Sequence, residues 1–149
     1  MKRRELIKMA AAAGVGAVAL SGFSSMQARA DSDVPRHLAD PAHPTVLEQK
    51  HVPFVKAPSK VVRGKWFNVK VKVGFKLPHP STAGHWIKDI KLLVNGKDLV
   101  ELDNEVGGIT SPDGYFTIRL YGPADLAAIA TCNLHGSWIS NPVRISVGA

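Results

Sequence analysis

The only cysteine of the chain, Cys132, lies three residues before His135, and Gly136 follows directly. A thiolate and an imidazole at this spacing, where a strand enters a tight loop, can both bind one metal ion. Sulfur and imidazole nitrogen suit copper, iron, zinc or nickel rather than magnesium or calcium. A lone cysteine is also common as a small buried apolar residue, so this pair alone leaves both interpretations open.

Three further histidines lie beside proline or glycine. His51 is followed by Val52-Pro53, while His79 and His85 bracket a loop that contains Pro80 and Gly84. Such residues restrict the loop and lower the entropy cost of directing two imidazoles at one point. Four histidines of this kind and one cysteine are hard to assign to packing, and they indicate a shared metal site. His37 and His43, in a proline-rich stretch, are expected to be solvated surface residues.

Three motifs carry a resemblance to a known family. They are Lys50-His51-Val52-Pro53, His79-Pro80 with His85 six residues after His79, and Cys132-Asn133-Leu134-His135-Gly136 with Trp138. In this order and spacing they resemble the superoxide reductases, the neelaredoxin and desulfoferrodoxin iron proteins. The similarity runs from about Leu47 to the C-terminus and includes Val71-Lys72-Val73-Gly74.

The resemblance implies an immunoglobulin-like β-sandwich that holds one mononuclear non-haem iron, cycling between ferrous and ferric. It implies four equatorial imidazole ligands and one axial sulfur, with the opposite axial position open for substrate. The equatorial ligands would be His51, His79, His85 and His135, and the axial ligand Cys132. The implied reaction reduces superoxide to hydrogen peroxide, and an external electron-donor protein, rubredoxin- or cytochrome-like, returns the iron to ferrous.

Lys50 and two neighbouring residues are candidates for roles at the open axial position, where the substrate would bind. A lysine next to His51 can attract superoxide and orient a water that protonates the departing peroxide; the alternative is an ordinary exposed lysine. The family commonly shows Glu-Lys-His, but here Gln49 stands in the glutamate position, and a neutral amide is a poor ligand for ferric iron. Glu48 is the alternative sixth ligand if the chain bends, although on a strand its side chain would face the other way.

A copper electron carrier without enzymatic activity is the alternative function. Cupredoxin-like modules are also β-sandwiches with a late Cys-x-x-His loop, and they use two histidines, one cysteine and a weak axial ligand. All methionines of the chain, Met1, Met9 and Met26, lie in the first 30 residues, where none can serve as that axial ligand. Four histidines also exceed what a blue-copper site needs.

Hydrophobic alternation predicts an all-β sandwich, and the resemblance implies that it is an immunoglobulin-like antiparallel β-sandwich. Predicted strands cover residues 66–75, 86–94, 97–102, 115–121, 125–132 and 138–147. Asn95-Gly96 is a strong hairpin signal, and Pro142 indicates an edge or a bulge in the last strand. Residues 125–132 are rich in alanine and could form a helix; we predict a strand because it must deliver Cys132 to the site. No other segment predicts a helix.

The N-terminal 30 residues resemble a twin-arginine export signal rather than part of the fold. Arg3-Arg4 precedes an apolar run, Met9–Leu20, which is shorter than the roughly 20 residues of a spanning helix, and Ala28-Arg29-Ala30 offers a cleavage site. We therefore predict a periplasmic protein with no stable membrane anchor after signal removal; an uncleaved anchor is the alternative. Residues 31–45 are predicted to be an extended segment, and residues 46–149 the iron-binding domain.

Charge and cysteine content exclude several classes of protein. Residues 1–30 carry a net charge of +4, which leaves +3 of the whole-chain +7 on the remainder. A mildly basic domain without an arginine-rich patch does not indicate nucleic-acid binding, but it favours small anions. With one cysteine there is no intrachain disulfide and no four-cysteine second iron centre. The sequence does not determine the oligomeric state, and a homo-oligomer is compatible with it.

Overall fold

The computed structural model describes residues 34–149, so the predicted signal and its cleavage site lie outside the described residues. One helix, α1 (Val46–His51), precedes the strands. In chain order the strands are β1 (Pro53–Lys56), β2 (Lys60–Val62), β3 (Phe67–Val73), β4 (Ile87–Val94), β5 (Lys97–Asp103), β6 (Gly114–Ile118), β7 (Ala124–Cys132), β8 (Gly136–Ile139) and β9 (Val143–Gly148). Within this range no helix is long and apolar enough to cross a bilayer.

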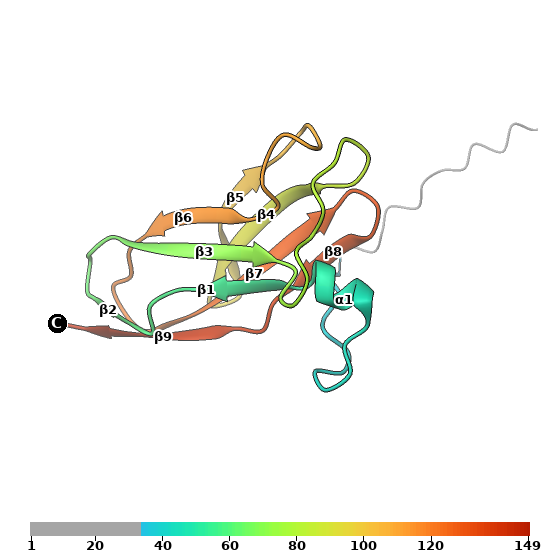
Figure 1. Ribbon diagram of the computed structural model, residues 1–149. Helices are drawn as coiled ribbons and strands as arrows, with labels where there is room; N and C mark the ends of the chain where they lie inside the picture. Colours follow the sequence, from blue (N-terminus) through green and yellow to red (C-terminus); the bar gives the residue numbers. More distant parts are fainter. Residues whose placement is uncertain (1–33) are drawn as a thin grey trace, which may run out of the picture.

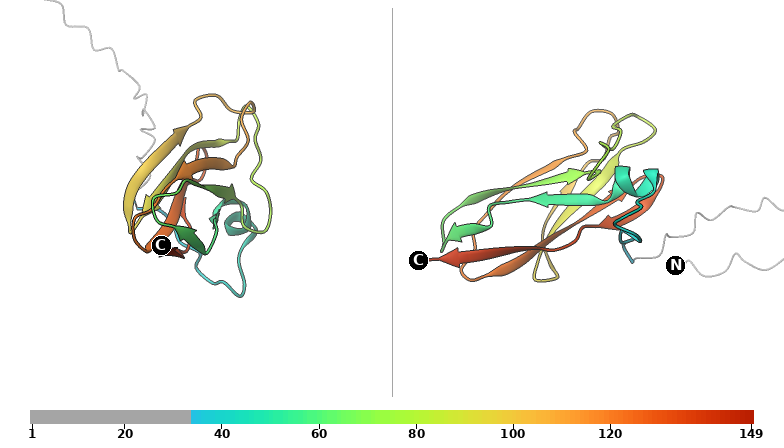
Figure 2. Two further views of the ribbon diagram at one scale, coloured as in Figure 1. Left: turned by 90° about the vertical axis from the view of Figure 1, so that its left-hand side faces the viewer. Right: turned by 60° about the horizontal axis from the view of Figure 1, so that its bottom comes forward.

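Two sheets pack face to face (Figures 1 and 2). The smaller sheet has the order β1-β3-β6, and the larger has the order β2-β9-β7-β4-β5 with β8 also paired to β7. All neighbouring strands are antiparallel except β2 and β9, which are parallel. The predicted immunoglobulin-like β-sandwich is therefore confirmed, with one parallel pair at an edge of the larger sheet.

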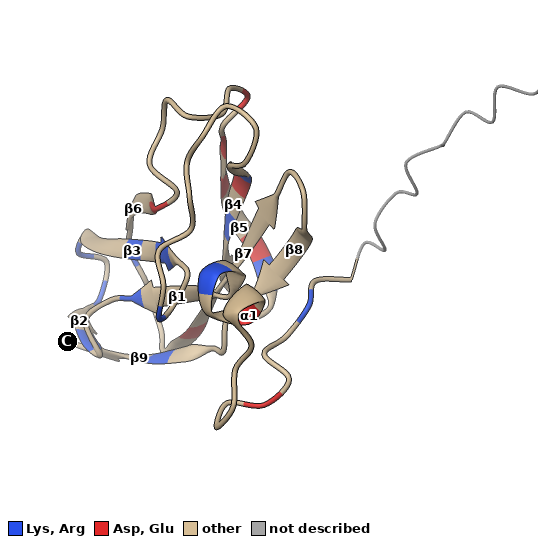
Figure 3. Cartoon of the chain, turned by 45° about the vertical axis from the view of Figure 1, so that its right-hand side comes forward, with Lys and Arg blue, Asp and Glu red and all other residues tan. Residues whose placement is uncertain are grey.

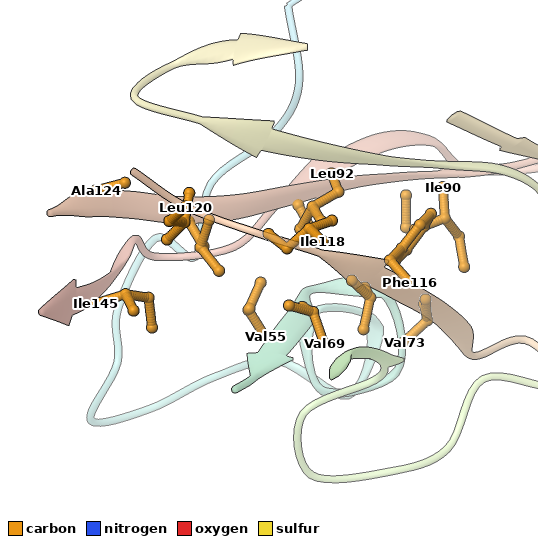
Figure 4. Packing of buried hydrophobic residues seen from close by; sticks show 14 of the residues in the cluster. Val55, Val69, Val73, Ile90, Leu92, Phe116, Ile118, Leu120, Ala124 and Ile145 are labelled. Atoms are coloured by element: carbon orange, nitrogen blue, oxygen red, sulfur yellow. The ribbon is translucent and has the colours of Figure 1, made fainter. Parts of the chain in front are cut away.

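The core lies between the sheets and follows the period of two expected for half-buried strands. In β3, Val69, Val71 and Val73 are buried, while the lysines between them are partly exposed. In β7 every second residue from Ala124 to Cys132 is buried, so the strand prediction for the alanine-rich segment is confirmed. Figure 4 shows the two inner faces meeting around Ile90, Leu92 and Phe116. Cys132 is the last member of the inward row of β7, and the alternation brings its sulfur to one end of the core.

Three local predictions need correction. Residues 46–51 form a helix, which the motif Thr45-x-x-Glu48 could have indicated as a capping box. The predicted last strand is split into β8 and β9, because Ser140 leaves the β8 ladder and Pro142 has no N–H to donate. The short strands β1 and β2 were not predicted.

The predicted extended segment before α1 is tied to the larger sheet. The N–H of Arg36 donates to Ser137 O at 2.9 Å, and the N–H of Ile139 donates to Arg36 O at 3.0 Å. Arg36 thereby forms a bridge to Trp138 in β8. This contact places the residues before α1 beside the β7–β8 hairpin, at the end of the sandwich where α1 lies (Figure 1).

Candidate metal centre

Four imidazoles form a closed ring at this end of the sandwich. The centroids of neighbouring rings lie 4.7 Å apart for His51 and His79, 4.6 Å for His79 and His85, 5.0 Å for His85 and His135, and 4.6 Å for His135 and His51. Across the ring, His51 and His85 are 5.8 Å apart. The structure thus brings together all four histidines that the sequence indicated, while His37 and His43 are exposed, as expected.

The nitrogen atoms of this ring fit a metal ion. The Nε2 atoms of His51, His79 and His85 are buried and have no hydrogen-bond partner, which is rare for buried polar atoms. Ligand atoms of His51, His85, Cys132 and His135 all lie within 4.8 Å of one another. Two ligands at metal–ligand distances of about 2.0–2.3 Å can be at most about 4.5 Å apart, so these four atoms need little adjustment to reach one ion. His79 lies outside this set of four, but its ring completes the circle between His51 and His85.

Local backbone contacts fix the tautomers of two of these histidines. His51 is the last residue of α1, and its Nδ1 donates to Leu47 O, one turn earlier, at 2.7 Å. The Nδ1 of His79 donates to Pro80 O at 2.6 Å. Because a carbonyl oxygen only accepts, Nδ1 carries the proton and Nε2 is left with a free lone pair. Both side chains therefore present Nε2 as the ligand atom.

The β7–β8 hairpin positions the sulfur and the fourth histidine. Cys132 pairs with Gly136, whose φ of 71° closes the turn, and Sγ lies 3.5 Å from His135 Nδ1. The Nε1–H of Trp138 donates to His135 O at 3.2 Å, and the Trp138 ring lies 5.6 Å from the His51 ring. Trp138 is buried against the centre and supports both His51 and His135.

Burial sets the protonation of these groups. It lowers the pKa of His51 and of His85, and lowers the pKa of His79 to about 4, so the three imidazoles are neutral at pH 7. Burial raises the pKa of the Cys132 thiol, and hydrogen bonds from the N–H groups of Leu134 and His135 oppose this rise. A bound cation would reverse the effect of burial and favour the thiolate.

Lys50 precedes His51 in α1, where it is the basic residue marked in Figure 3, and its side chain is half-buried. After burial, its positive charge is among the causes that lower the pKa of His51 and of His85. The positive charge of Lys50 therefore disfavours protonation of two imidazoles of the centre.

The side chains of Glu48 and Gln49 are both hydrogen-bonded to the segment before α1. Glu48 is buried; its Oε1 accepts from Ala39 N at 2.8 Å, and its Oε2 accepts from Thr45 N at 2.7 Å and from Thr45 Oγ1 at 2.8 Å. The Nε2 of Gln49 donates to Pro44 O at 2.9 Å. The structure thus places Glu48 in the cap of α1 and gives no support to Glu48 as a sixth ligand.

Asn133 is a residue of the site that the sequence analysis did not single out. Its backbone and side chain make hydrogen bonds to both chain neighbours of His85. Its place inside the Cys132–His135 motif was a signal, but its partners are backbone atoms of a distant loop.

Comparison with known proteins places this geometry in a family. The family model for desulfoferrodoxin matches residues 43–141, which include all five candidate ligands. Among curated relatives, the chain is 33% identical over 98 residues to the superoxide reductase of Thermococcus kodakarensis (60% of this chain, 83% of the relative). It is 31% identical over 110 residues to that of Pyrococcus furiosus (60% and 84%).

A solved structure of a superoxide reductase is also similar to this chain. The superoxide reductase (neelaredoxin) of Ignicoccus hospitalis is 37% identical, with a TM-score of 0.58 over 66% of this chain and 81% of that one. The family match and these relatives lend no support to the copper alternative. The chain belongs to the desulfoferrodoxin family.

Proposed function

We propose that this protein is a superoxide reductase, an oxidoreductase that converts superoxide to hydrogen peroxide with one electron and two protons at a single iron. The observation that carries the proposal is the closed ring of four imidazoles, three with buried and unpartnered Nε2 atoms, beside one cysteine sulfur. Relatives named superoxide reductase, at 31–33% identity, support it.

The side chains of the centre divide into those that hold the metal and those that serve the substrate. The imidazoles of His51, His79, His85 and His135 and the thiolate of Cys132 would hold the iron, which supplies the electron for superoxide when bound. Neutral imidazoles and one thiolate leave the centre with positive charge in either oxidation state, which suits an anionic substrate.

Lys50 would act on the substrate side. Its ammonium group attracts superoxide and orients a water that delivers a proton to the product. Since Glu48 and Gln49 are bound to the segment before α1, neither is part of this proposal.

The partners and the location form the remaining part of the proposal. An external protein, rubredoxin- or cytochrome-like, would return the electron. The Arg3-Arg4 motif and the small-residue cleavage site support export to the periplasm, where the enzyme would protect against oxidative stress. Replacing both arginines by lysine should leave the protein in the cytoplasm; normal export of that variant would exclude the twin-arginine route.

Metal analysis and product analysis of one preparation test the function. The anaerobically purified protein should contain one iron per chain, and it should consume superoxide with hydrogen peroxide as product and no release of oxygen from this half-reaction. One copper per chain, or no reaction of the reduced iron protein with superoxide, would overturn the proposal.

A further inference from the structure

The His85 side chain lacks the local support that the other ring members have. His51 and His79 are each fixed by a hydrogen bond from Nδ1 to a nearby carbonyl, and His135 lies in the tight β7–β8 turn. Within residues 34–149 no hydrogen bond is made by the His85 ring, and its Nε2 is buried without a partner. Its position therefore depends on the backbone that carries it.

Within its own loop the backbone of His85 forms a bridge to Thr82, and Asn133 ties that loop to the Cys132–His135 turn. The side-chain Oδ1 of Asn133 accepts from Trp86 N at 2.9 Å, and its Nδ2 donates to Gly84 O at 3.0 Å. The backbone N–H of Asn133 donates to Trp86 O at 3.1 Å. Both chain neighbours of His85 are thus bound to the residue that directly follows Cys132.

We propose that Asn133 is a positioning residue for the metal centre: its side-chain amide fixes the His85 loop against the Cys132–His135 turn, so that His85 and Cys132 reach one ion together. This inference rests on the proposed metal site but goes beyond the ligands themselves. Asparagine is the side chain of this length that offers an acceptor and a donor at once. Aspartate keeps the acceptor for Trp86 N but would set a negative oxygen against Gly84 O.

Metal affinity measured without substrate tests the proposal. The probe is Co²⁺, which accepts nitrogen and sulfur ligands and gives a thiolate absorption band, added to metal-free protein in the presence of a competing chelator. Supporting partners of metal ligands typically change affinity about 10–100-fold. We expect Asn133→Ala and Asn133→Asp each to weaken Co²⁺ binding by about that factor.

Ser140→Ala is the matched control. It removes another buried hydrogen bond, from Ala128 N to Ser140 Oγ at 2.9 Å, in the same sheet but outside the ligand loops. This control should lose stability to urea to a similar extent and bind Co²⁺ like the parent protein. If Asn133→Ala does not fold, Asn133→Asp, which keeps one of the two side-chain bonds, carries the test.

A double-substitution cycle shows whether Asn133 acts through His85. In a His85→Ala background, Asn133→Ala should change the Co²⁺ dissociation constant less than about 2-fold, because the side chain it positions is gone. Full additivity of the two substitutions, or parent-like Co²⁺ affinity of both Asn133 variants, would overturn the inference. If the parent protein binds neither Co²⁺ nor iron, the proposed function itself fails, which is a separate outcome.

Discussion

Three imidazoles of the centre are oriented by local contacts, and these contacts decide which nitrogen each presents to the metal site. His51 and His79 donate Nδ1–H to carbonyls of their own segments, whereas His135 approaches sulfur with Nδ1. The Nε2 atom of His85 is also buried without a partner, so three ligands would bind through Nε2 and one through Nδ1. Burial lowers the pKa of His51, His79 and His85 and raises that of the Cys132 thiol before metal enters, so metal binding must displace a proton from Cys132.

Cys132→Ser tests the sulfur ligand. Serine nearly preserves the shape of the buried side chain, so the fold should persist by circular dichroism. Because a neutral hydroxyl is a poor electron donor to the metal, the thiolate absorption band and superoxide reduction should both be lost. A variant that still reduces superoxide at the parent rate would remove Cys132 from the axial position.

Lys50→Ala tests the substrate-side charge. Loss of one positive charge beside the ring should slow the reaction with superoxide roughly 10-fold at low ionic strength, with a smaller difference at high salt. Iron content and absorption spectrum should stay unchanged. Lys97→Ala, on the exposed β4–β5 hairpin, makes the same change in net charge and should leave the rate as it was. Equal rates for both variants would exclude Lys50 from the mechanism.

The lowered pKa of His79 predicts how the metal-free protein responds to acid. In the folded protein His79 stays neutral down to about pH 4, while in the unfolded chain it is protonated below its ordinary pKa of 6.5. The unfolded state thus binds more protons between these values, and stability should fall as pH is lowered from 6.5 to about 4. His51 and His85 shift in the same direction and add to the effect.

Urea unfolding of metal-free protein between pH 7.5 and 4.5 measures this dependence. His79→Gln, which cannot be protonated, should show a shallower loss of stability over the same range. A midpoint that does not change with pH in the parent protein would contradict the neutral, buried imidazoles described above.

At the scale of elements, α1 connects the N-terminal segment to the centre. Its cap joins Thr45 and Glu48 in both directions, Glu48 also receives the N–H of Ala39, and His51 ends the helix. A six-residue helix has little stability of its own, so the cap and the packing of His51 must hold it in place. A substitution of Thr45 should therefore change the affinity of the centre for metal.

Thr45→Ala removes the cap and should cost about 1 kcal/mol of stability. Because the buried Glu48 also loses one donor, Co²⁺ binding should weaken together with stability. Thr117→Ala, which removes an exposed bond to Asn68 between β3 and β6, is the control without contact to the centre. Equal metal affinity of the two variants would mean that His51 is held without the cap.

Elements with a clear period were predictable, and those fixed by distant contacts were not. The alternation of Val69, Val71 and Val73 defines β3 because one face meets the core. The small helix was missed since its length gives no helical period, although its capping box stands in the sequence. The amide of Asn133 could not be assigned, because its partners, Gly84 O and Trp86 N, are backbone atoms that only the fold brings near.

At the scale of the whole molecule, the candidate ligands come from α1, the loop between β3 and β4, and the β7–β8 hairpin. The smaller sheet, the larger sheet and the helix must all be in place before five donors meet. This explains why the ligand types could be predicted from the sequence, while the ring geometry depends on long-range strand pairing.

Metal removal should therefore lower the stability of the entire domain. A ligand present at 100 times its dissociation constant stabilises the folded state by about 2.7 kcal/mol. For a domain of this size that corresponds to a melting temperature about 10 °C higher than that of the chelator-treated protein. The His51→Ala variant should show a much smaller shift on metal addition, and an equal shift would place the bound metal elsewhere.

The spread of the donors over the chain has a practical consequence. An ion held jointly by the helix, the loop after β3 and the β7–β8 hairpin loses its colour when any of these parts detaches. The visible absorption of the loaded protein would then serve as an optical reporter of cooperative unfolding, readable without an added dye or label.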